Sequence, residues 1–273
     1  MSTEAFVKAF TSKKVTAALL IYWAIAWIVA AWLLLTYKPW STEVLGFAGD
    51  PARSFMCPII SLIECPPLFL FVIHQWMKHP EWMAPRGKYT PGRIYPLLGP
   101  YNVVGIVIIM AAMIASGFIV SPLFDLPIFF AWIASFYLNP WIAGWGTGLS
   151  ILFRQIIWGG FSPLFAFGLA FFDWWAYSTI SLVFYYVVER ARAQGKRLLP
   201  YYVLIVILAN LIQRALGTWH YVMWLFPGPA YLPACWAWLV GYTLGPGFAT
   251  AAVALFVSEL AVKITYARYK PPT

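Results

Sequence analysis

Long apolar runs separated by short polar segments dominate the pattern of this chain. Runs of about twenty apolar residues are long enough to cross the hydrocarbon core of a bilayer as α-helices. The alternation of apolar and polar positions that is typical of an outer-membrane β-barrel is absent from the sequence. The apolar runs cover residues 15–37, 56–77, 100–121, 161–188, 199–226 and 235–266. The pattern therefore predicts an all-α polytopic membrane protein.

A further apolar segment, residues 124–158, is too long for one upright helix and contains Asn139-Pro140. Proline lacks the backbone donor that continues a helix, and it disfavours the helical conformation in the residue before it. We therefore expect the segment to break at Asn139-Pro140 into two helices.

The distribution of basic residues predicts how often this segment crosses the membrane. Lysine and arginine gather in four groups, namely Lys8, Lys13 and Lys14, then Lys78, Arg86, Lys88 and Arg93, then Arg190, Arg192, Lys196 and Arg197, and last Arg268 and Lys270. Under the positive-inside rule, all four groups are cytoplasmic only if an even number of crossings separates Arg93 from Arg190. Residues 124–158 then cross twice. We expect about eight spans in the cell membrane, with both termini in the cytoplasm.

Composition and charge agree with this interpretation. Hydrophobic residues make up 62% of the 273 residues and charged residues only 10%, so the lipid bilayer is the main environment of the chain. The net charge of +9 fits cytoplasmic loops that contact anionic lipid head groups. A nucleic-acid partner is not needed to explain it.

The helix after Pro140 combines packing glycines with charge. Gly144 and Gly148 form a small-xxx-small face on which another helix can approach closely. Arg154 stands in the same helix, and a charge near the centre of a membrane helix costs about 2.5–3.5 kcal/mol on insertion scales. We expect Arg154 to pair with a carboxylate, to reach the outer interface, or to face a wet cavity.

Two later helices also carry polar residues at membrane depth. Asp173 is the best carboxylate partner for an arginine. On the next helix, Arg214 lies in one stripe with Asn210, and Gln213 and His220 lie in an adjacent stripe. Either an ion-pair network that only fixes helix packing or a substrate cavity explains these charges. Aromatic residues at the outer helix ends favour a cavity for a small, planar, polar ligand. The candidate substrate-binding residues are Arg154, Trp158, Asp173, Gln213, Arg214, His220, Trp224, Trp238 and Tyr242.

From residue 98 to about residue 266 the chain resembles the substrate-binding S component of energy-coupling-factor vitamin transporters. The resemblance rests on a first helix with Ala111-x3-Ala115, followed by the segments "FDLPIFFAWIASFYLNP", "WIAGWGTG", "GGFSP" and "GPGFATAAVALFVSELAVKITYARYK". It implies a six-helix substrate-binding module in residues 98–273, preceded by two additional spans and a cytoplasmic loop in residues 1–97. It also implies uptake of a small vitamin-like solute, and a transmembrane coupling protein with ATPases as partner.

Other classes of function remain as alternatives. A structural or quinone-interacting subunit of a larger membrane complex would use the same charges for packing, and a lipid or isoprenoid enzyme would use Asp173 or Glu64 as an acid. The three histidines do not form a haem or metal pattern, and no nucleophile set or P-loop is present. We therefore expect no catalytic site, metal or cofactor. Lys263 and Glu259, four residues apart, are interpreted as a surface pair.

Overall fold

A computed structural model of the chain describes residues 3–36, 51–83, 86, 96–119, 125–157, 163–213, 237, 240–241 and 244–266. Every regular element within these residues is a helix, so the all-α prediction is confirmed. The elements are α1 (Thr3–Phe10), α2 (Lys13–Thr36), α3 (Pro51–Lys78), the 3-10 turn η1 (Pro80–Met83), α4 (Pro100–Ser116), α5 (Leu126–Tyr137), α6 (Pro140–Ile157), α7 (Pro163–Phe184), the π-helical turn η2 (Tyr185–Glu189), α8 (Arg190–Ala193), α9 (Leu199–Ile212) and α12 (Pro246–Tyr266).

The predicted break at Asn139-Pro140 is confirmed. Helix α5 ends at Tyr137 and α6 begins at Pro140, whose missing N–H is not needed in the first turn of a helix. The Asn139 side chain accepts a hydrogen bond from the Ile142 amide at 2.8 Å and thereby caps α6. Its amide nitrogen donates to Asn102 Oδ1 at 2.9 Å, which ties the turn to α4.

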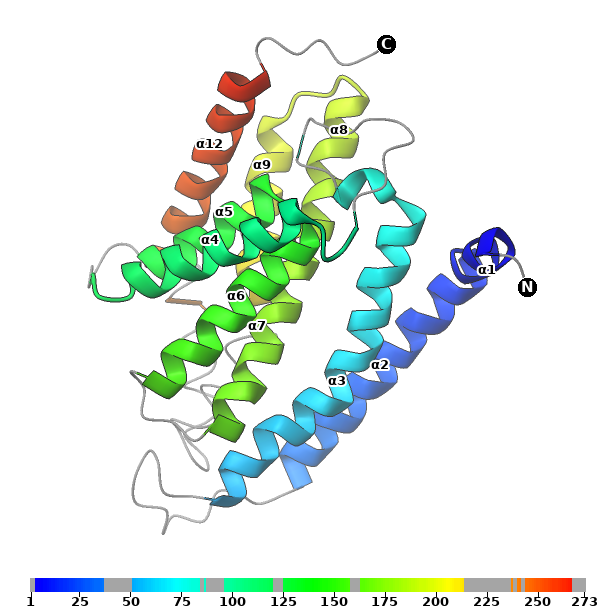
Figure 1. Cartoon of the computed structure of the whole chain (residues 1–273), viewed down its shortest axis with the longest axis vertical. Helices are drawn as coiled ribbons and strands as arrows, with labels where there is room; N and C mark the ends of the chain where they lie inside the picture. The colour runs from blue at the N-terminus through cyan, green and yellow to red at the C-terminus, as the bar shows by residue number, and fades with distance from the viewer. Residues whose placement is uncertain are drawn as a thin grey trace.

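Helices α6 and α7 form the centre of the molecule (Figure 1). Helices α2 and α3 lie side by side, and α3 also packs against α7. Helices α4 and α5 run across the α6 and α7 pair in this view, while α9 and α12 adjoin each other near the C-terminal end. Helix α12 also packs along α5, so α5 is enclosed by α4, α6, α7 and α12.

The glycines of α6 allow its close approach to α7. A Cβ on Gly148 would lie 2.9 Å from the Ala170 carbonyl oxygen, and one on Gly144 would overlap the Ser178 hydroxyl. Because real Cβ atoms do not come this close to backbone, only glycine fits at these positions in this packing. The predicted small-xxx-small face is thus confirmed, with α7 as its partner.

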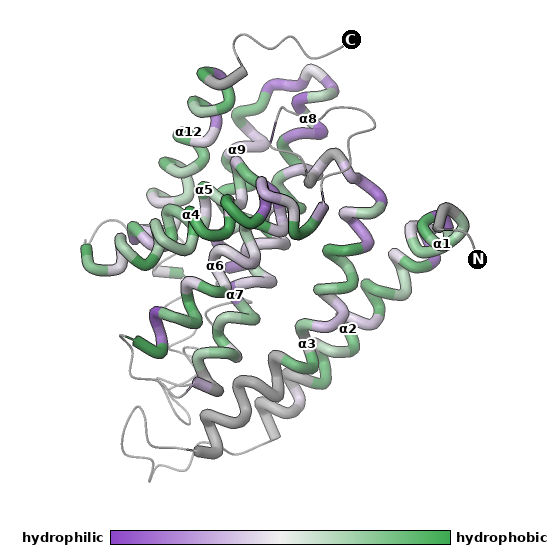
Figure 2. Tube along the Cα trace, in the orientation of Figure 1, coloured by the Kyte–Doolittle hydropathy of each residue, from purple (hydrophilic) through white to green (hydrophobic). Residues whose placement is uncertain are grey.

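Large apolar side chains cover the outside of the described helices. Ile28 on α2, Ile108 on α4 and Phe256 on α12 are each more than half exposed. Polar side chains such as Asn102 and Glu259 are instead buried between helices. Figure 2 shows hydrophilic segments at α8 and at the upper end of α3, whereas most of α2 and α4 is hydrophobic. Exposed apolar side chains in this number are typical of a surface that contacts lipid or another protein.

Two helical stretches within the described residues, Ala166–Ala193 and Pro246–Ile264, are long and apolar enough to cross a membrane. Helices α4, α5 and α9 are apolar but shorter. The 12 residues of α5 extend about 18 Å at about 1.5 Å per residue, compared with about 30 Å of hydrocarbon core. The two long apolar stretches and the exposed apolar side chains indicate a membrane protein.

Candidate functional site

Arg154 lies near the end of α6, in the electrostatic field of two carboxylates. Asp125 precedes α5 and Asp173 lies on α7, and both are close enough to interact electrostatically with the partly buried Arg154 guanidinium. The Asp173 side chain is buried. We refer to Asp125, Arg154 and Asp173 as the outer charged group.

Local structure fixes the position of Asp125. Its carboxylate accepts a hydrogen bond from the Ile128 amide at 3.2 Å and so caps α5. Its backbone amide lies 3.5 Å from Thr250 Oγ1 in the first turns of α12. Asp125 therefore lies where the beginning of α5 is next to the first turns of α12. Sequence reasoning missed Asp125, although an aspartate directly before the apolar run "LPIFF" is a capping signal.

The structure brings together only part of the predicted substrate site. Arg154 and Asp173 share the outer charged group, and Gln213 is buried at the end of α9. The other predicted site residues lie outside the described residues, namely Trp158, Arg214, His220, Trp224, Trp238 and Tyr242. Their role stays a prediction.

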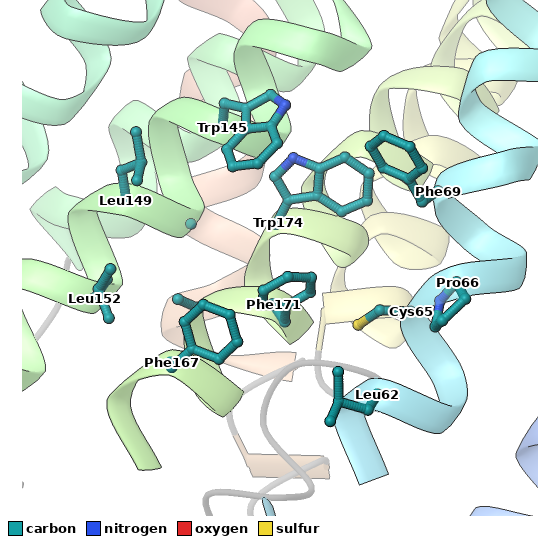
Figure 3. A pocket seen from close by; sticks show the side chains of 12 residues that line it. Leu62, Cys65, Pro66, Phe69, Trp145, Leu149, Leu152, Phe167, Phe171 and Trp174 are labelled. Atoms are coloured by element: carbon teal, nitrogen blue, oxygen red, sulfur yellow. The ribbon is translucent and has the colours of Figure 1, made fainter. Parts of the chain in front are cut away.

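An apolar cleft of about 430 Å³ lies on a different face of α6 and α7 (Figure 3). Helix α3 forms one wall with Cys65 and Phe69, and α6 forms another with Trp145 and Leu149. Arg154 is five residues beyond Leu149, or about 140° around the helix at about 100° per residue, so it does not face this cleft. The cleft and the outer charged group are therefore separate sites. The sequence did not predict the cleft, because its lining residues resemble ordinary lipid-facing positions.

A second set of charges lies toward the opposite ends of α5 and α12, where Arg86 and Glu259 are buried and Glu189 and Arg192 are partly exposed. Arg86 is 4% exposed, and its Nε donates to Glu189 Oε1 at 2.8 Å while its Nη2 donates to Glu259 Oε1 at 2.5 Å. Arg192 Nη2 donates to the other Glu259 oxygen at 2.7 Å. We refer to Arg86, Glu189, Arg192 and Glu259 as the inner ion cluster. Two positive and two negative charges balance in it.

Further contacts fix Arg86 within this cluster. Its Nη1 donates to the Phe136 carbonyl at 3.0 Å, and its guanidinium carbon lies 4.5 Å from the centre of the Phe184 ring. The arginine thus joins the residues after η1 to α5, α7 and α12. The π-helical turn η2 supplies Glu189, and such turns recur at functional positions in helices.

The interpretation of Glu259 and Lys263 as a surface pair is wrong. Glu259 is buried and bonded to Arg86 and Arg192, whereas Lys263 is exposed. Residues four positions apart can pair on a solvated helix face. Here the Glu259 carboxylate is more stable between two arginines, away from lipid.

His74 lies in a buried group of hydrogen-bonding side chains. His74 is fully buried, with its Nε2 3.1 Å from Thr16 Oγ1 and its Nδ1 3.1 Å from Gln75 Nε2. Gln75 Oε1 in turn accepts from the Tyr186 hydroxyl at 2.5 Å. Within the described ranges, no three His, Cys, Asp or Glu side chains gather as metal ligands would. The His74 contacts join α2, α3 and η2.

Comparison of the chain with known protein families, with curated proteins and with solved structures finds no match.

Proposed function

We propose that this chain is a polytopic membrane protein of about eight spans, and that it is the substrate-binding component of a transporter for a small polar solute. The observation that carries the proposal is the outer charged group. A partly buried arginine, one partly buried carboxylate and one buried carboxylate lie near one another in a helix bundle with many exposed apolar side chains. Such charges are costly at membrane depth and mark substrate or ion pathways in many membrane proteins.

The arrangement of α5 supports the double crossing of residues 124–158. The start of α5 at Asp125 is next to Thr250, and its end at Phe136 is near Glu259 through Arg86. Because Glu259 lies farther along α12 than Thr250, α5 runs in the same direction as α12. Helix α6 then returns after Pro140. A short helix can traverse the apolar layer when other helices enclose it on several sides.

The surface of α4 supports an interaction with a coupling protein. Ala111 and Ala115 are both exposed on α4, as are Val107 and Ile108 on the same helix. Small residues on an exposed helix face allow the backbone of a partner helix to come close. This face fits the transmembrane coupling protein with ATPases that the sequence resemblance implies.

A structural subunit of a larger membrane complex is the second candidate. The inner ion cluster favours it, because that cluster shows that this fold uses balanced buried charges for helix packing. In that case the outer charged group would serve the same purpose, and no solute would stabilise the isolated chain.

The test of the proposed function is the thermal stability of the purified protein with a panel of vitamins, nucleobases and amino-acid derivatives. A ligand at about 100 times its Kd adds about 2.7 kcal/mol to the free energy of unfolding. We expect at least one planar anionic or hydrogen-bonding solute to raise the melting temperature. Arg154→Gln should abolish that shift, because the guanidinium would hold the anionic edge of the ligand.

Arg190→Gln is the matched control, since Arg190 is exposed and lies outside the outer charged group. It should retain the full ligand-induced shift. A panel without any stabilising solute, or equal stabilisation of Arg154→Gln and the native chain, would favour the structural subunit.

A further inference from the structure

Two cations near α8 have no carboxylate partner within the described residues. Arg190 and Lys196 are both exposed. The carboxylates of this region, Glu189 and Glu259, bond instead to arginines of the inner ion cluster, where charges balance. The positive charges of Arg190 and Lys196 are therefore not compensated by the described part of the chain.

A cleft of about 300 Å³ lies beside these cations, between the η2 and α8 segment and the first turn of α9. We refer to it as the basic cleft. Its polar lining residues are Tyr186, Arg190, Gln194, Lys196 and Tyr201. Two of these side chains are positively charged, the others are neutral, and no described carboxylate lines the space. The basic cleft therefore attracts an anion.

The turn after α8 fixes the position of Lys196. The Gly195 amide donates to the Arg192 carbonyl at 2.9 Å. The Lys196 amide donates to the Ala191 carbonyl at 3.0 Å, which completes the Schellman motif that ends many helices. Gly195 has a φ of +67°, a conformation that favours glycine. The backbone thus keeps Lys196 at the same cleft as Arg190 without an ion pair.

The side chains of the basic cleft suit a phosphate group. An arginine guanidinium presents a planar fork of N–H donors that matches two phosphate oxygens, and a lysine ammonium adds a point charge. Lys196 Nζ lies 6.0 Å from the centre of the Tyr201 ring, so the ammonium group is next to the α9 wall. The Tyr201 hydroxyl and the Gln194 amide supply neutral donors.

Apolar side chains on α9 favour the phosphate of a lipid over that of a soluble compound. Leu204 is three residues beyond Tyr201, about 60° around the helix at about 100° per residue, and it is 43% exposed. Leu211 continues this side of α9 two turns farther and is 39% exposed. A cationic cleft at the end of an exposed apolar helix side matches the head group and the acyl chains of one phospholipid.

The predicted topology agrees with such a lipid. In the eight-span arrangement residues 190–197 lie on the cytoplasmic side, and Figure 2 shows the hydrophilic α8 segment near one end of the largely hydrophobic bundle. Anionic lipids give the cytoplasmic leaflet a negative surface potential, which attracts basic residues beside the membrane.

We propose that the basic cleft binds the phosphate of one anionic phospholipid from the cytoplasmic leaflet, with Arg190 and Lys196 as its counter-ions. The acyl chains lie along the side of α9 that carries Leu204 and Leu211. The inference rests on the membrane placement proposed above. It is independent of the polar solute, because the basic cleft and the outer charged group share no residue.

Native mass spectrometry of the purified full chain tests this site. Protein in lipid-free detergent is mixed with equal amounts of phosphatidylglycerol and phosphatidylcholine that have the same acyl chains, and the bound lipids are identified by mass. We expect one phosphatidylglycerol to bind at a lower lipid concentration than phosphatidylcholine does. Arg190→Gln and Lys196→Gln should each weaken this binding about fivefold, because each removes one charge at the phosphate.

The double variant Arg190→Gln with Lys196→Gln has a matched control. Arg197→Gln with Lys263→Gln also removes two exposed basic charges, but neither residue lines the basic cleft. The control should bind phosphatidylglycerol within about twofold of the native chain, since distant exposed charges are screened by salt. If the double variant at the cleft does not fold, the two single variants decide the outcome.

The proposal would be wrong on any of three results. Equal affinity for the two lipids would show that charge does not select the occupant. An equal loss of binding in the control would indicate attraction by net charge alone. A rise in melting temperature with inorganic phosphate as large as that with phosphatidylglycerol would indicate a soluble phosphate compound. Stabilisation of Arg190→Gln by the transported solute, measured without lipid, separates these results from a failure of the transport proposal.

Discussion

Replacing Arg86 with glutamine should lower the free energy of unfolding by about 3–5 kcal/mol, the usual cost of removing one partner from a buried ion pair. The loss is large because Glu189 and Glu259 would both keep their charge without their principal counter-ion. Unfolding of the purified protein in mixed detergent micelles, followed by helical circular dichroism, measures it.

Two variants serve as comparisons for Arg86→Gln. Arg190→Gln should change stability by less than about 1 kcal/mol, since exposed charges contribute little. Arg86→Lys should fall between the two, because lysine keeps the charge but lacks the planar fork that reaches Glu189, Glu259 and the Phe136 carbonyl together. If Arg86→Gln and Arg190→Gln have equal stability, the inner ion cluster does not hold the fold.

The second large effect concerns the outer charged group. Asp173→Asn and Arg154→Gln should each be destabilising, and the double variant should be less destabilised than the sum of the two, with a coupling energy of about 0.5–3 kcal/mol. The reason is that the double variant leaves no uncompensated charge between the two positions.

The same cycle with Asp125→Asn isolates the charge of Asp125. Asparagine caps a helix as well as aspartate does, so α5 should keep its cap while the electrostatic interaction with Arg154 is lost. We expect coupling of Arg154 to both carboxylates. Additive losses in both cycles would mean that Arg154 does not interact with these carboxylates.

The sequence predicted the parts of the fold that depend on local chemistry. Proline at position 140 defines the break between α5 and α6, and the spacing of Gly144 and Gly148 defines the packing face of α6. These predictions were possible because proline and glycine have backbone properties that restrict the local structure wherever these residues occur.

Long-range contacts could not be predicted in this way. Arg86 and Glu259 are separated by 173 residues, and Arg86 was assigned to a cytoplasmic loop by charge counting. The apolar cleft lies between α3, α6 and α7, and its lining residues carry no pattern that differs from other membrane helices. Asp173 could be identified from the sequence because a carboxylate within an apolar run is unusual, whichever residues it contacts in the fold.

The division into residues 1–97 and 98–273 also stays a prediction. Helix α3 packs against α7, and Arg86 bonds to Glu189 and Glu259, so the first part of the chain has extensive contacts with the second. An additional pair of spans joined to a six-helix module would show such contacts, and so would a single eight-helix bundle.

Thiol accessibility in intact cells tests the eight-span topology most directly. Single cysteines are introduced as Thr11→Cys, Ser41→Cys and Ala193→Cys after alanine replaces the native cysteines. We predict that a membrane-impermeant thiol reagent labels only the cysteine at position 41 from outside, and that those at positions 11 and 193 react after permeabilisation. Labelling of position 193 but not position 11 from outside would contradict the eight-span topology, because residues 124–158 would then cross the membrane only once.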